Sequence, residues 1–239
     1  ALAEAERAHR RIAALPDGGH PATPAEAMAI EARVLELVGR EVAGWKVATN
    51  SEGVSTWGAI FAEDCLTSPA RLPAERMPLR GIEGEVAFRF TRDLPARAEP
   101  YSRDEIRAVL AAFPAIEIVD SRFENYDGTP SLDRTADRMS NGGLVSGTAE
   151  PGADQRDLSN LHVTLIRNGE TVLDRMGGHS RKDPLLPVIE FIHARQSSLS
   201  FRAGQFITAG TLTGVVFGEK GDDYRVHFSG LGAVEVAFS

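Results

Sequence analysis

The segment Gly81–Phe90, with the sequence Gly-Ile-Glu-Gly-Glu-Val-Ala-Phe-Arg-Phe, constrains the fold more than any other part of the chain. The run reads as a β-strand, in which residues two apart point to the same side. The side chains of Glu83 and Glu85 therefore project together, roughly 6.5 Å apart along the strand, while the apolar residues that follow face the other way. Two neighbouring carboxylates beside a core repel each other and need a cation, a shared proton or bulk water. A divalent metal ion with oxygen ligands is one interpretation, and a solvated strand face is the other.

A third glutamate, Glu117, lies in the apolar run Ala115–Val119, which also predicts a strand. Aliphatic neighbours on both sides of Glu117 indicate that its strand is buried on at least one face. A buried carboxylate needs a cation or hydrogen-bond donors. Three carboxylates without an associated histidine pair favour a hard cation, Mg²⁺ first and Mn²⁺ or Ca²⁺ next. Glu83, Glu85 and Glu117 together are thus a candidate metal site, and the solvated strand face stays open as the alternative.

Two further residues could take part in chemistry, although each has a simpler interpretation. Lys46 stands in an apolar strand pattern between Trp45 and Val47. A lysine in that place can bind a substrate carboxylate or stabilise an enolate. The local sequence by itself favours a lysine that faces outward and covers apolar surface with its stem. Asp64 can equally be a turn residue.

Charge and hydropathy exclude several classes of protein. The 239 residues carry a net charge of −8 and contain no block of lysine or arginine, which argues against a nucleic-acid surface. Residues 1–7 are charged and amphipathic, without the apolar core of a signal peptide, and no apolar run approaches the length of a membrane span. The single cysteine, Cys65, excludes an internal disulfide and a cysteine-cluster metal site. We expect a soluble, cytoplasmic protein.

The pattern of elements divides the chain into a helical N-terminal segment, residues 1–40, and a β-rich domain, residues 41–239. In the first part, apolar periodicity predicts a helix over residues 1–15. A capping box at Thr23–Glu26 begins a second helix, which Gly39 ends.

Two segments of the β-rich domain differ from the strands around them. Ser102 and Glu105 predict a capped helix that Pro114 ends. Residues 120–143 are polar and have little apolar periodicity, which is typical of a functional loop.

Several common catalytic motifs are missing from the sequence. The six histidines show no metal-ligand spacing, and only His179, in a Gly-Gly-His-Ser run, lies in a flexible context that a substrate could reach. No Gly-x-Ser-x-Gly elbow occurs, although a Ser-His-Asp triad stays open. The run Gly210–Gly214 lacks the Lys-Ser/Thr ending of a phosphate-binding loop.

Five motifs follow one another in a fixed order: Gly-Trp-Lys at 44–46, Glu-Gly-Glu-x-Ala-Phe at 83–88, Glu-Ile-Val-Asp-Ser-Arg at 117–122, Ala-Gly-x₅-Gly-Thr-Leu-Thr at 203–213 and Leu-Gly-x-Val-x-Val at 231–236. Together they resemble the 2-keto-4-pentenoate hydratase/4-oxalocrotonate decarboxylase family of the fumarylacetoacetate hydrolase superfamily. The resemblance extends from the helix at Thr23 to Phe238. It implies an α+β fold, a mixed β-sandwich roll or pseudobarrel with a small helical segment at the N-terminus.

The resemblance also implies a site and a reaction. It implies Mg²⁺ or Mn²⁺ bound by Glu83, Glu85 and Glu117, and it marks Lys46 as the active-site lysine and Asp64 as its acidic companion. The metal of family members chelates the C1 carboxylate and C2 oxygen of a 2-oxo or 2-hydroxy-dienoic acid. The implied enzyme is a Mg²⁺-dependent lyase that adds water to 2-hydroxy-2,4-dienoates in aromatic-compound catabolism. A 4-oxalocrotonate decarboxylase is the first alternative, followed by an acylpyruvate hydrolase and a non-catalytic binding or partner subunit.

Two segments that border the substrate in the family differ in this chain. Residues 137–141 read Asp-Arg-Met-Ser-Asn where the family has Asp-Asn-Ala-Ser, and residues 177–184 replace a Gly-rich run that ends in Gly-x-Pro. The added Arg138 can bind a second carboxylate of a diacid, or pair with Asp133 or Asp137 within the loop. Whether Arg181 faces the ligand stays open, and a homo-oligomer or a hydratase–decarboxylase complex is expected. The residues expected to bind substrate are Arg122, Arg138, Ser140, His179 and Thr211.

Overall fold

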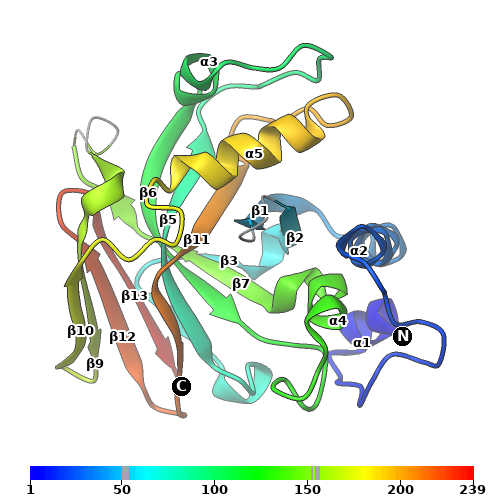
Figure 1. Ribbon diagram of the computed structural model, residues 1–239. Helices are drawn as coiled ribbons and strands as arrows, with labels where there is room; N and C mark the ends of the chain where they lie inside the picture. The colour runs from blue at the N-terminus through cyan, green and yellow to red at the C-terminus, as the bar shows by residue number, and fades with distance from the viewer. Residues whose placement is uncertain (50–53, 152, 154–156) are drawn as a thin grey trace.

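The computed structural model describes residues 1–49, 54–151, 153 and 157–239, which form two β-sheets with helices around them (Figure 1). The α-helices are α1 (Leu2–Ala8), α2 (Pro24–Val38), α3 (Arg103–Arg107), α4 (Ser131–Ala136) and α5 (Leu185–Arg195). The strands are β1 (Val42–Thr49), β2 (Ser55–Phe61), β3 (Cys65–Thr67), β4 (Ala70–Leu72), β5 (Gly81–Phe90), β6 (Leu110–Val119), β7 (Asn141–Ser146), β8 (Thr148–Ala149), β9 (His162–Arg167), β10 (Glu170–Met176), β11 (Phe206–Phe217), β12 (Asp223–Phe228) and β13 (Gly232–Phe238).

The two sheets are both mixed. The first has the strand order β2-β1-β11-β5-β6-β7-β3, in which β1 runs parallel to β11 and β3 parallel to β7. The second has the order β10-β9-β12-β13-β4, with β8 also paired to β13. The two mixed sheets, together with the helices around them, confirm the expected α+β class.

Strand β5 has different surroundings on its two faces, and this explains its Glu-Gly-Glu sequence. Glu83 and Glu85 point away from the second sheet, whereas Gly84 between them faces it. A Cβ atom on Gly84 would lie 2.8 Å from Cγ1 of Val226 on β12. Glycine at this position therefore lets the two sheets approach each other while its neighbours face the opposite side.

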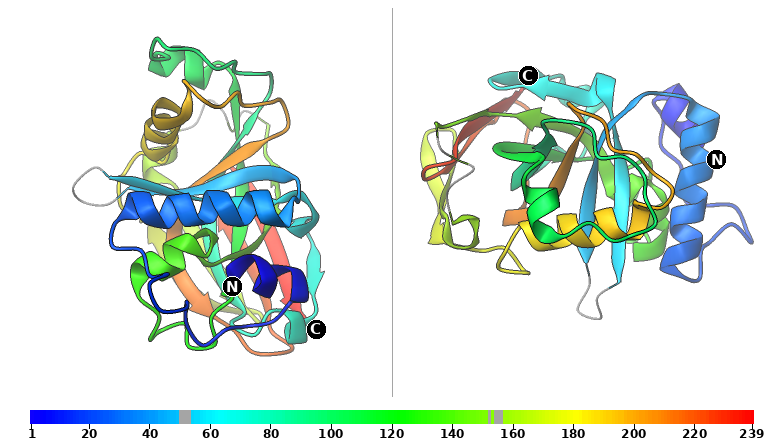
Figure 2. Two further views of the ribbon diagram at one scale, coloured as in Figure 1. Left: turned by 90° about the vertical axis from the view of Figure 1, so that its right-hand side faces the viewer. Right: turned by 90° about the horizontal axis from the view of Figure 1, so that it is seen from above.

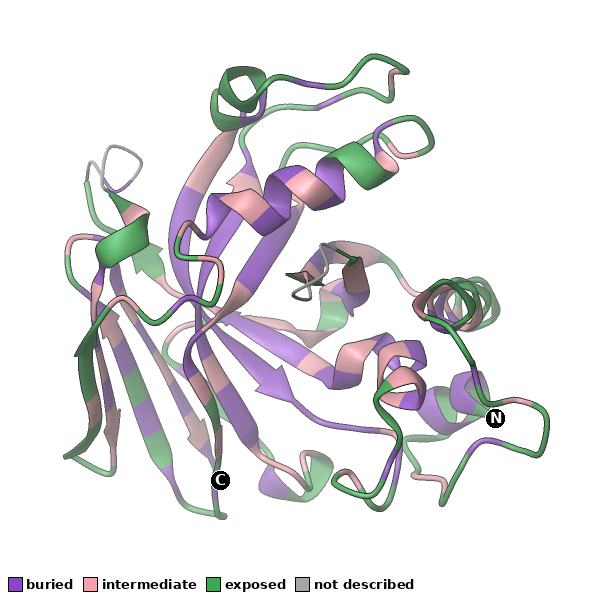
Figure 3. Cartoon of the chain, in the orientation of Figure 1, coloured by how far each residue is buried: buried purple, intermediate pink, exposed green. Residues whose placement is uncertain are grey.

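The main core lies between the two sheets and beneath α5. Figure 3 shows the buried residues that run along β5, β6 and β11 and on one side of α5. Burial of these side chains is the main source of stability in a fold of this kind. Members of this core from both sheets and from α5 include Val86, Phe88, Ile116, Val226, Val234 and Phe191.

The N-terminal helices have a smaller core of their own. Helices α1, α2 and α4 lie together at one side of the molecule, as two further views confirm (Figure 2). Their shared cluster contains Leu2 and Val34 from the N-terminal segment, but also Phe123 and Ala136 from the segment between β6 and β7. The division at residue 40 stays a prediction. None of the described helices combines the length and hydropathy that a membrane crossing requires.

Two predicted helices are wrong in length. The first helix ends at Ala8, because His9 adopts a left-handed conformation with φ of 48°, and Ile12 then pairs with Phe123. The helix after Ser102 has the predicted capping box but only five residues. Pro114 does not end it, since Pro114 lies within β6 opposite Val86. The expected loop 120–143 contains α4 and the start of β7. The helix after Thr23, by contrast, is confirmed with both caps.

Glu31 on α2 is buried and should make stability depend on pH. It accepts a hydrogen bond of 2.7 Å from the amide of Ala59, and burial raises the pKa of its carboxyl from 4.5 to about 7. Between these values the unfolded chain releases a proton that the folded chain keeps, so stability falls as pH rises. We expect the wild type to lose about 3 kcal/mol relative to Glu31→Gln between pH 4.5 and 7. Urea unfolding of both proteins across this range measures the difference, and a pH-independent difference would contradict it.

Candidate metal centre and active site

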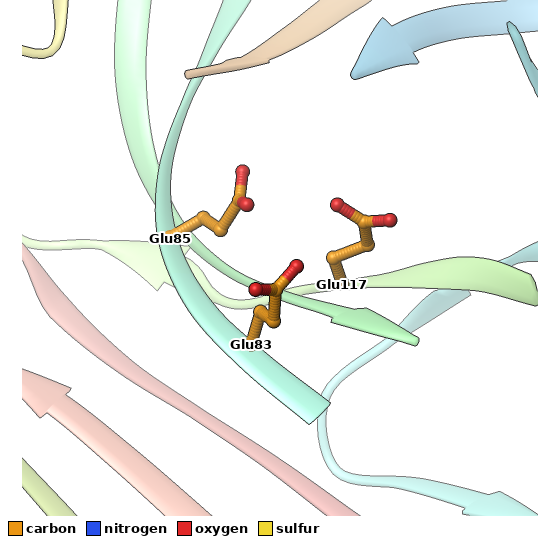
Figure 4. A group of neighbouring side chains, drawn as sticks. All are labelled: Glu83, Glu85 and Glu117. Atoms are coloured by element: carbon orange, nitrogen blue, oxygen red, sulfur yellow. The ribbon is translucent and has the colours of Figure 1, made fainter. Parts of the chain in front are cut away.

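Three carboxylates meet on one face of the first sheet (Figure 4). Glu83 and Glu85 come from β5, and Glu117 lies on β6 directly opposite Glu83. One carboxylate oxygen from each of the three lies within 4.8 Å of the others. Glu85 and Glu117 are buried and Glu83 is half-buried. The solvated strand face that the sequence left open is therefore excluded for Glu85 and Glu117.

Lys46 reaches this group from β1. Its Nζ lies 2.5 Å from Oε1 of Glu117 and donates a hydrogen bond of 3.1 Å to the carbonyl of Met139. Strand β11 separates β1 from β5, so the side chain spans the distance along the same face of the sheet. The outward-facing lysine that the local sequence favoured is thus wrong, because the side chain is only 12% exposed and points to the carboxylates.

The four charged groups shift one another's ionisation. Burial, together with the charges of Glu117 and Glu83, raises the pKa of Glu85 well above its ordinary value. Burial likewise raises the pKa of Glu117 to about 7, although Lys46 opposes the shift. Burial acts to lower the pKa of Lys46, but the surrounding carboxylates outweigh it and raise that pKa. The lysine is therefore an ammonium ion, and the carboxylates lack the positive charge that would keep all of them ionised.

The residues present fit a divalent cation. When the three glutamates and Lys46 are all ionised, two negative charges remain, which one divalent ion would neutralise. Among the described residues, Oε2 of Glu117 is buried without a hydrogen-bond partner, although such atoms are normally satisfied. All three ligands offer oxygen, the donor that Mg²⁺, Mn²⁺ and Ca²⁺ prefer.

A turn between α4 and β7, residues 137–141, supplies further groups to the carboxylates. Asn141 donates a hydrogen bond of 3.1 Å from Nδ2 to Oε1 of Glu117, and the carbonyl of Met139 contacts Lys46. The sequence interpretation missed both residues. The sequence contained a signal for Asn141, because this residue directly follows Ser140, a residue expected to bind substrate, in the polar segment 120–143.

The backbone of this turn is left-handed at three successive residues that are not glycine. The φ values of Arg138, Met139 and Ser140 are 49°, 53° and 58°. Such a conformation costs roughly 1–2 kcal/mol per residue. The Oγ atom of Ser140 is buried and, within the described chain, has no hydrogen-bond partner. Ser140 was expected to bind substrate, and its position beside Asn141 keeps that a prediction.

Arg122 and Arg138 were also expected to bind substrate, but both guanidinium groups have protein partners. Arg122 donates to the side chain of Asp137 at 2.5 Å and to the carbonyls of Asp137 and Asn141 at 2.8 and 2.7 Å. Arg138 is 2% exposed and pairs with Glu6 of α1 at 2.9 Å. The loop pairing of Arg138 with Asp133 or Asp137 that the sequence allowed is replaced by this contact with the N-terminal helix.

A bulge in β11 surrounds Glu85 from the other side. The amide of Gly210, which has φ of 100°, donates to Oε2 of Glu85 at 3.1 Å. The Nδ1 atom of His179 accepts from the amide of Arg181, so Nε2 carries the proton that is donated to the carbonyl of Ala209 at 2.7 Å.

Both ring nitrogens of His179 are therefore engaged, and burial lowers its pKa. Thr211 lies in the same bulge, opposite Glu85. Contact of His179 and Thr211 with substrate stays a prediction. Thr208, a buried polar residue of β11 and the register partner of Lys46, was not among the expected site residues.

Asp64 has a different partner from the one that the family resemblance implied. It forms an ion pair of 2.8 Å with Arg40. It also lines a cavity of about 750 Å³, and the described residues around that cavity include neither Lys46 nor the three glutamates. A role for Asp64 as the companion of Lys46 stays a prediction.

Comparison with known proteins identifies a family and several relatives of this chain. Residues 57–239 match the family described as fumarylacetoacetate (FAA) hydrolase C-terminal. A 2-keto-4-pentenoate hydratase from Paraburkholderia phymatum is 30% identical over 208 residues, which cover 85% of this chain and 78% of the relative. A second one, from Burkholderia vietnamiensis, is 29% identical and covers 100% of this chain and 95% of the relative.

A solved structure extends the likeness to the whole fold. The 4-oxalocrotonate decarboxylase from Pseudomonas putida G7, complexed with magnesium and adipate, has a TM-score of 0.81 at 22% identity, over 100% of this chain and 96% of that one. The chain therefore belongs to the fumarylacetoacetate hydrolase family and is related to its 2-keto-4-pentenoate hydratases.

Proposed function

We propose that this protein is a metal-dependent hydratase that adds water to 2-hydroxy-2,4-dienoates in the catabolism of aromatic compounds. The observation that carries the proposal is the group of Glu83, Glu85 and Glu117, of which the last two are buried, with the Lys46 ammonium paired to Glu117. Relatives named 2-keto-4-pentenoate hydratase, about 30% identical over most of the chain, support the reaction.

The chemistry divides between a cation and the protein's own groups. Glu83, Glu85 and Glu117 would hold a divalent cation, which would supply Lewis-acid stabilisation of the negative charge that develops on the substrate. The Lys46 ammonium lies beside Glu117, so it can act as the general acid that protonates C5 of the substrate. The C2 hydroxyl loses its proton in the same step, and the product is a 2-oxo-3-enoate. Water then adds at C4 and a proton at C3, and the product is a 4-hydroxy-2-oxo acid. Asp64 stays the predicted companion in these proton transfers.

The arginines near the site favour a substrate with a single carboxylate. A diacid, the substrate expected for a decarboxylase, would need a cation for its second carboxylate. Arg138 already pairs with Glu6, and Arg181 forms a bidentate pair with Glu190 at 2.7 and 3.0 Å. Because both guanidinium groups are occupied, we place hydration before decarboxylation.

Absorbance spectroscopy tests this choice directly. With MgCl₂ and 2-hydroxypenta-2,4-dienoate, the protein should remove the absorbance of the conjugated dienol, and EDTA should stop the loss. With 2-oxo-hex-3-enedioate, little CO₂ should form. The reverse pattern would make the protein a decarboxylase. Tight metal binding with no change in any dienoate would instead favour the non-catalytic alternative, and cleavage of an acylpyruvate would indicate a hydrolase.

We further propose Mg²⁺ as the resident ion, with Mn²⁺ as the alternative, because the three ligands are carboxylate oxygens. Solved structures with this fold contain magnesium, calcium or manganese. A homo-oligomer or a complex with a decarboxylase is expected from the family likeness. A cytoplasmic location stays an expectation from the charge and hydropathy of the sequence.

A further inference from the structure

The turn at residues 137–141 presents two groups to the carboxylate site. The carbonyl of Met139 accepts a hydrogen bond of 3.1 Å from the Lys46 ammonium, and the side-chain amide of Asn141 donates to Glu117. The position of Lys46 therefore depends on the conformation of this turn. Three successive left-handed residues that are not glycine do not form such a turn unless surrounding contacts impose it.

Arg138 provides contacts that impose this conformation at the start of the left-handed run. Its Nη1 donates to the carbonyl of Ala59 at 3.2 Å, and its guanidinium lies 4.3 Å from the ring centre of Phe61. Its backbone also packs on β2, because a Cβ atom on Gly58 would lie 2.3 Å from the carbonyl oxygen of Arg138. The left-handed run is thus fixed to β2 through both the side chain and the backbone of one residue.

Glu6 on α1 completes this arrangement from the other end of the chain. Its carboxylate is 9% exposed and binds Arg138 at 2.9 Å and Arg40 at 2.6 Å, with Arg122 at 3.6 Å. A buried guanidinium needs such a partner, since an unpaired charge would be strongly destabilised. Helix α1 lies outside residues 57–239, the part that matches the family model. The N-terminal helix therefore connects to the active-site turn through Glu6, which pairs with Arg138 of the turn and lies 3.6 Å from Arg122, a donor to the Asn141 carbonyl.

We propose that Arg138 and Glu6 are positioning residues: they hold the 137–141 turn so that the Met139 carbonyl keeps the Lys46 ammonium against Glu117. This role rests on the proposed function only for its effect on turnover. Arg138 thus fixes the active-site turn by its contact with α1.

The test compares Arg138→Met and Glu6→Gln with the matched control Arg40→Met. Arg40 shares the Glu6 carboxylate and also stacks on Phe61, at 4.2 Å, but its contacts in the described chain do not include the turn. Because Arg40 also pairs with Asp64, this control is compared by hydrogen exchange and Mn²⁺ affinity and not by kcat. Arg138→Met should lower kcat for the dienoate by about 10²-fold, because small displacements of a reacting group have effects of that size. Both KM and the affinity for Mn²⁺, measured by calorimetry, should stay within about 3-fold, since the carboxylates are unchanged.

Hydrogen exchange gives a measure that does not depend on activity. Amides of residues 137–141 should exchange faster in Arg138→Met and, to a smaller extent, in Glu6→Gln, while Arg40→Met should match the wild type. Arg138→Lys keeps the charge and should recover part of kcat. The proposal is overturned by unchanged exchange and kcat in Arg138→Met, or by an equal rise in the exchange rate of residues 137–141 in Arg40→Met. If the wild type has no hydratase activity but the variants show the expected exchange pattern, the proposed reaction is rejected. The role of Arg138 and Glu6 in holding the turn is then kept.

Discussion

Glu85→Gln is expected to weaken Mn²⁺ and Mg²⁺ binding by at least about 10²-fold, because it removes one of three charged oxygen ligands. The same substitution should stabilise the metal-free protein. Glu85 is buried beside Glu83 and Glu117, and both burial and these charges raise its pKa. Removal of the carboxyl's charge relieves this repulsion, and the thermal midpoint should rise by roughly 2–4 °C for each kcal/mol recovered. Calorimetric titration with MnCl₂ and thermal unfolding in EDTA measure the two effects.

Glu31→Gln is the matched control for this experiment. Glu31 is another buried glutamate whose pKa burial raises, to about 7, but it lies on α2 and binds the amide of Ala59. Its substitution should leave Mn²⁺ affinity unchanged. Added Mn²⁺ should also raise the unfolding temperature of the wild type, since a ligand that binds only the folded state stabilises it. Glu85→Gln should lose this rise. Unchanged metal affinity in Glu85→Gln would reject the proposed ligand set.

Lys46→Met should remove turnover and keep metal binding. The ammonium is the proton donor that we place beside the substrate, and loss of a general acid reduces rates by about 10²- to 10⁴-fold. The same group pairs with Glu117 at 2.5 Å, so its positive charge competes with a cation for that carboxylate. We therefore expect Mn²⁺ affinity in Lys46→Met to equal or exceed that of the wild type, while kcat for the dienoate falls.

Lys220→Met controls for the loss of a lysine as such, because Lys220 forms an exposed ion pair with Glu75. It should keep kcat and Mn²⁺ affinity, as exposed ion pairs contribute little. If Lys46→Met kept full turnover, Lys46 would have no role in proton transfer. A parallel loss of metal affinity would instead show that Lys46 supports the ligand geometry.

The elements that were predicted correctly depend on local patterns. The helix after Thr23 has its side-chain cap and its glycine end because both signals lie within the helix's own residues. The helix over residues 1–15 was wrong because Ile12 pairs instead with Phe123, a contact over more than 100 residues of sequence. Pro114 does not end a helix, because it lies in β6 opposite Val86. From the sequence alone, a proline that ends a helix cannot be distinguished from a proline within a strand until the neighbouring strand is known.

The sequence alone determined that Glu83 and Glu85 share one face of a strand, because side chains alternate with period two along a strand. The apolar neighbours of Glu117 indicated a strand buried on at least one face, and only the structure showed that Glu117 itself is buried. It could not determine the register that places Glu117 opposite Glu83 or the ion pair of Lys46 with Glu117. It also gave no sign that Arg138 would pair with Glu6, 132 residues away. Only the tertiary structure decided these contacts. An unpaired buried charge is strongly destabilising, so each charge pairs with a group that the fold brings near it, however distant that group is in the sequence.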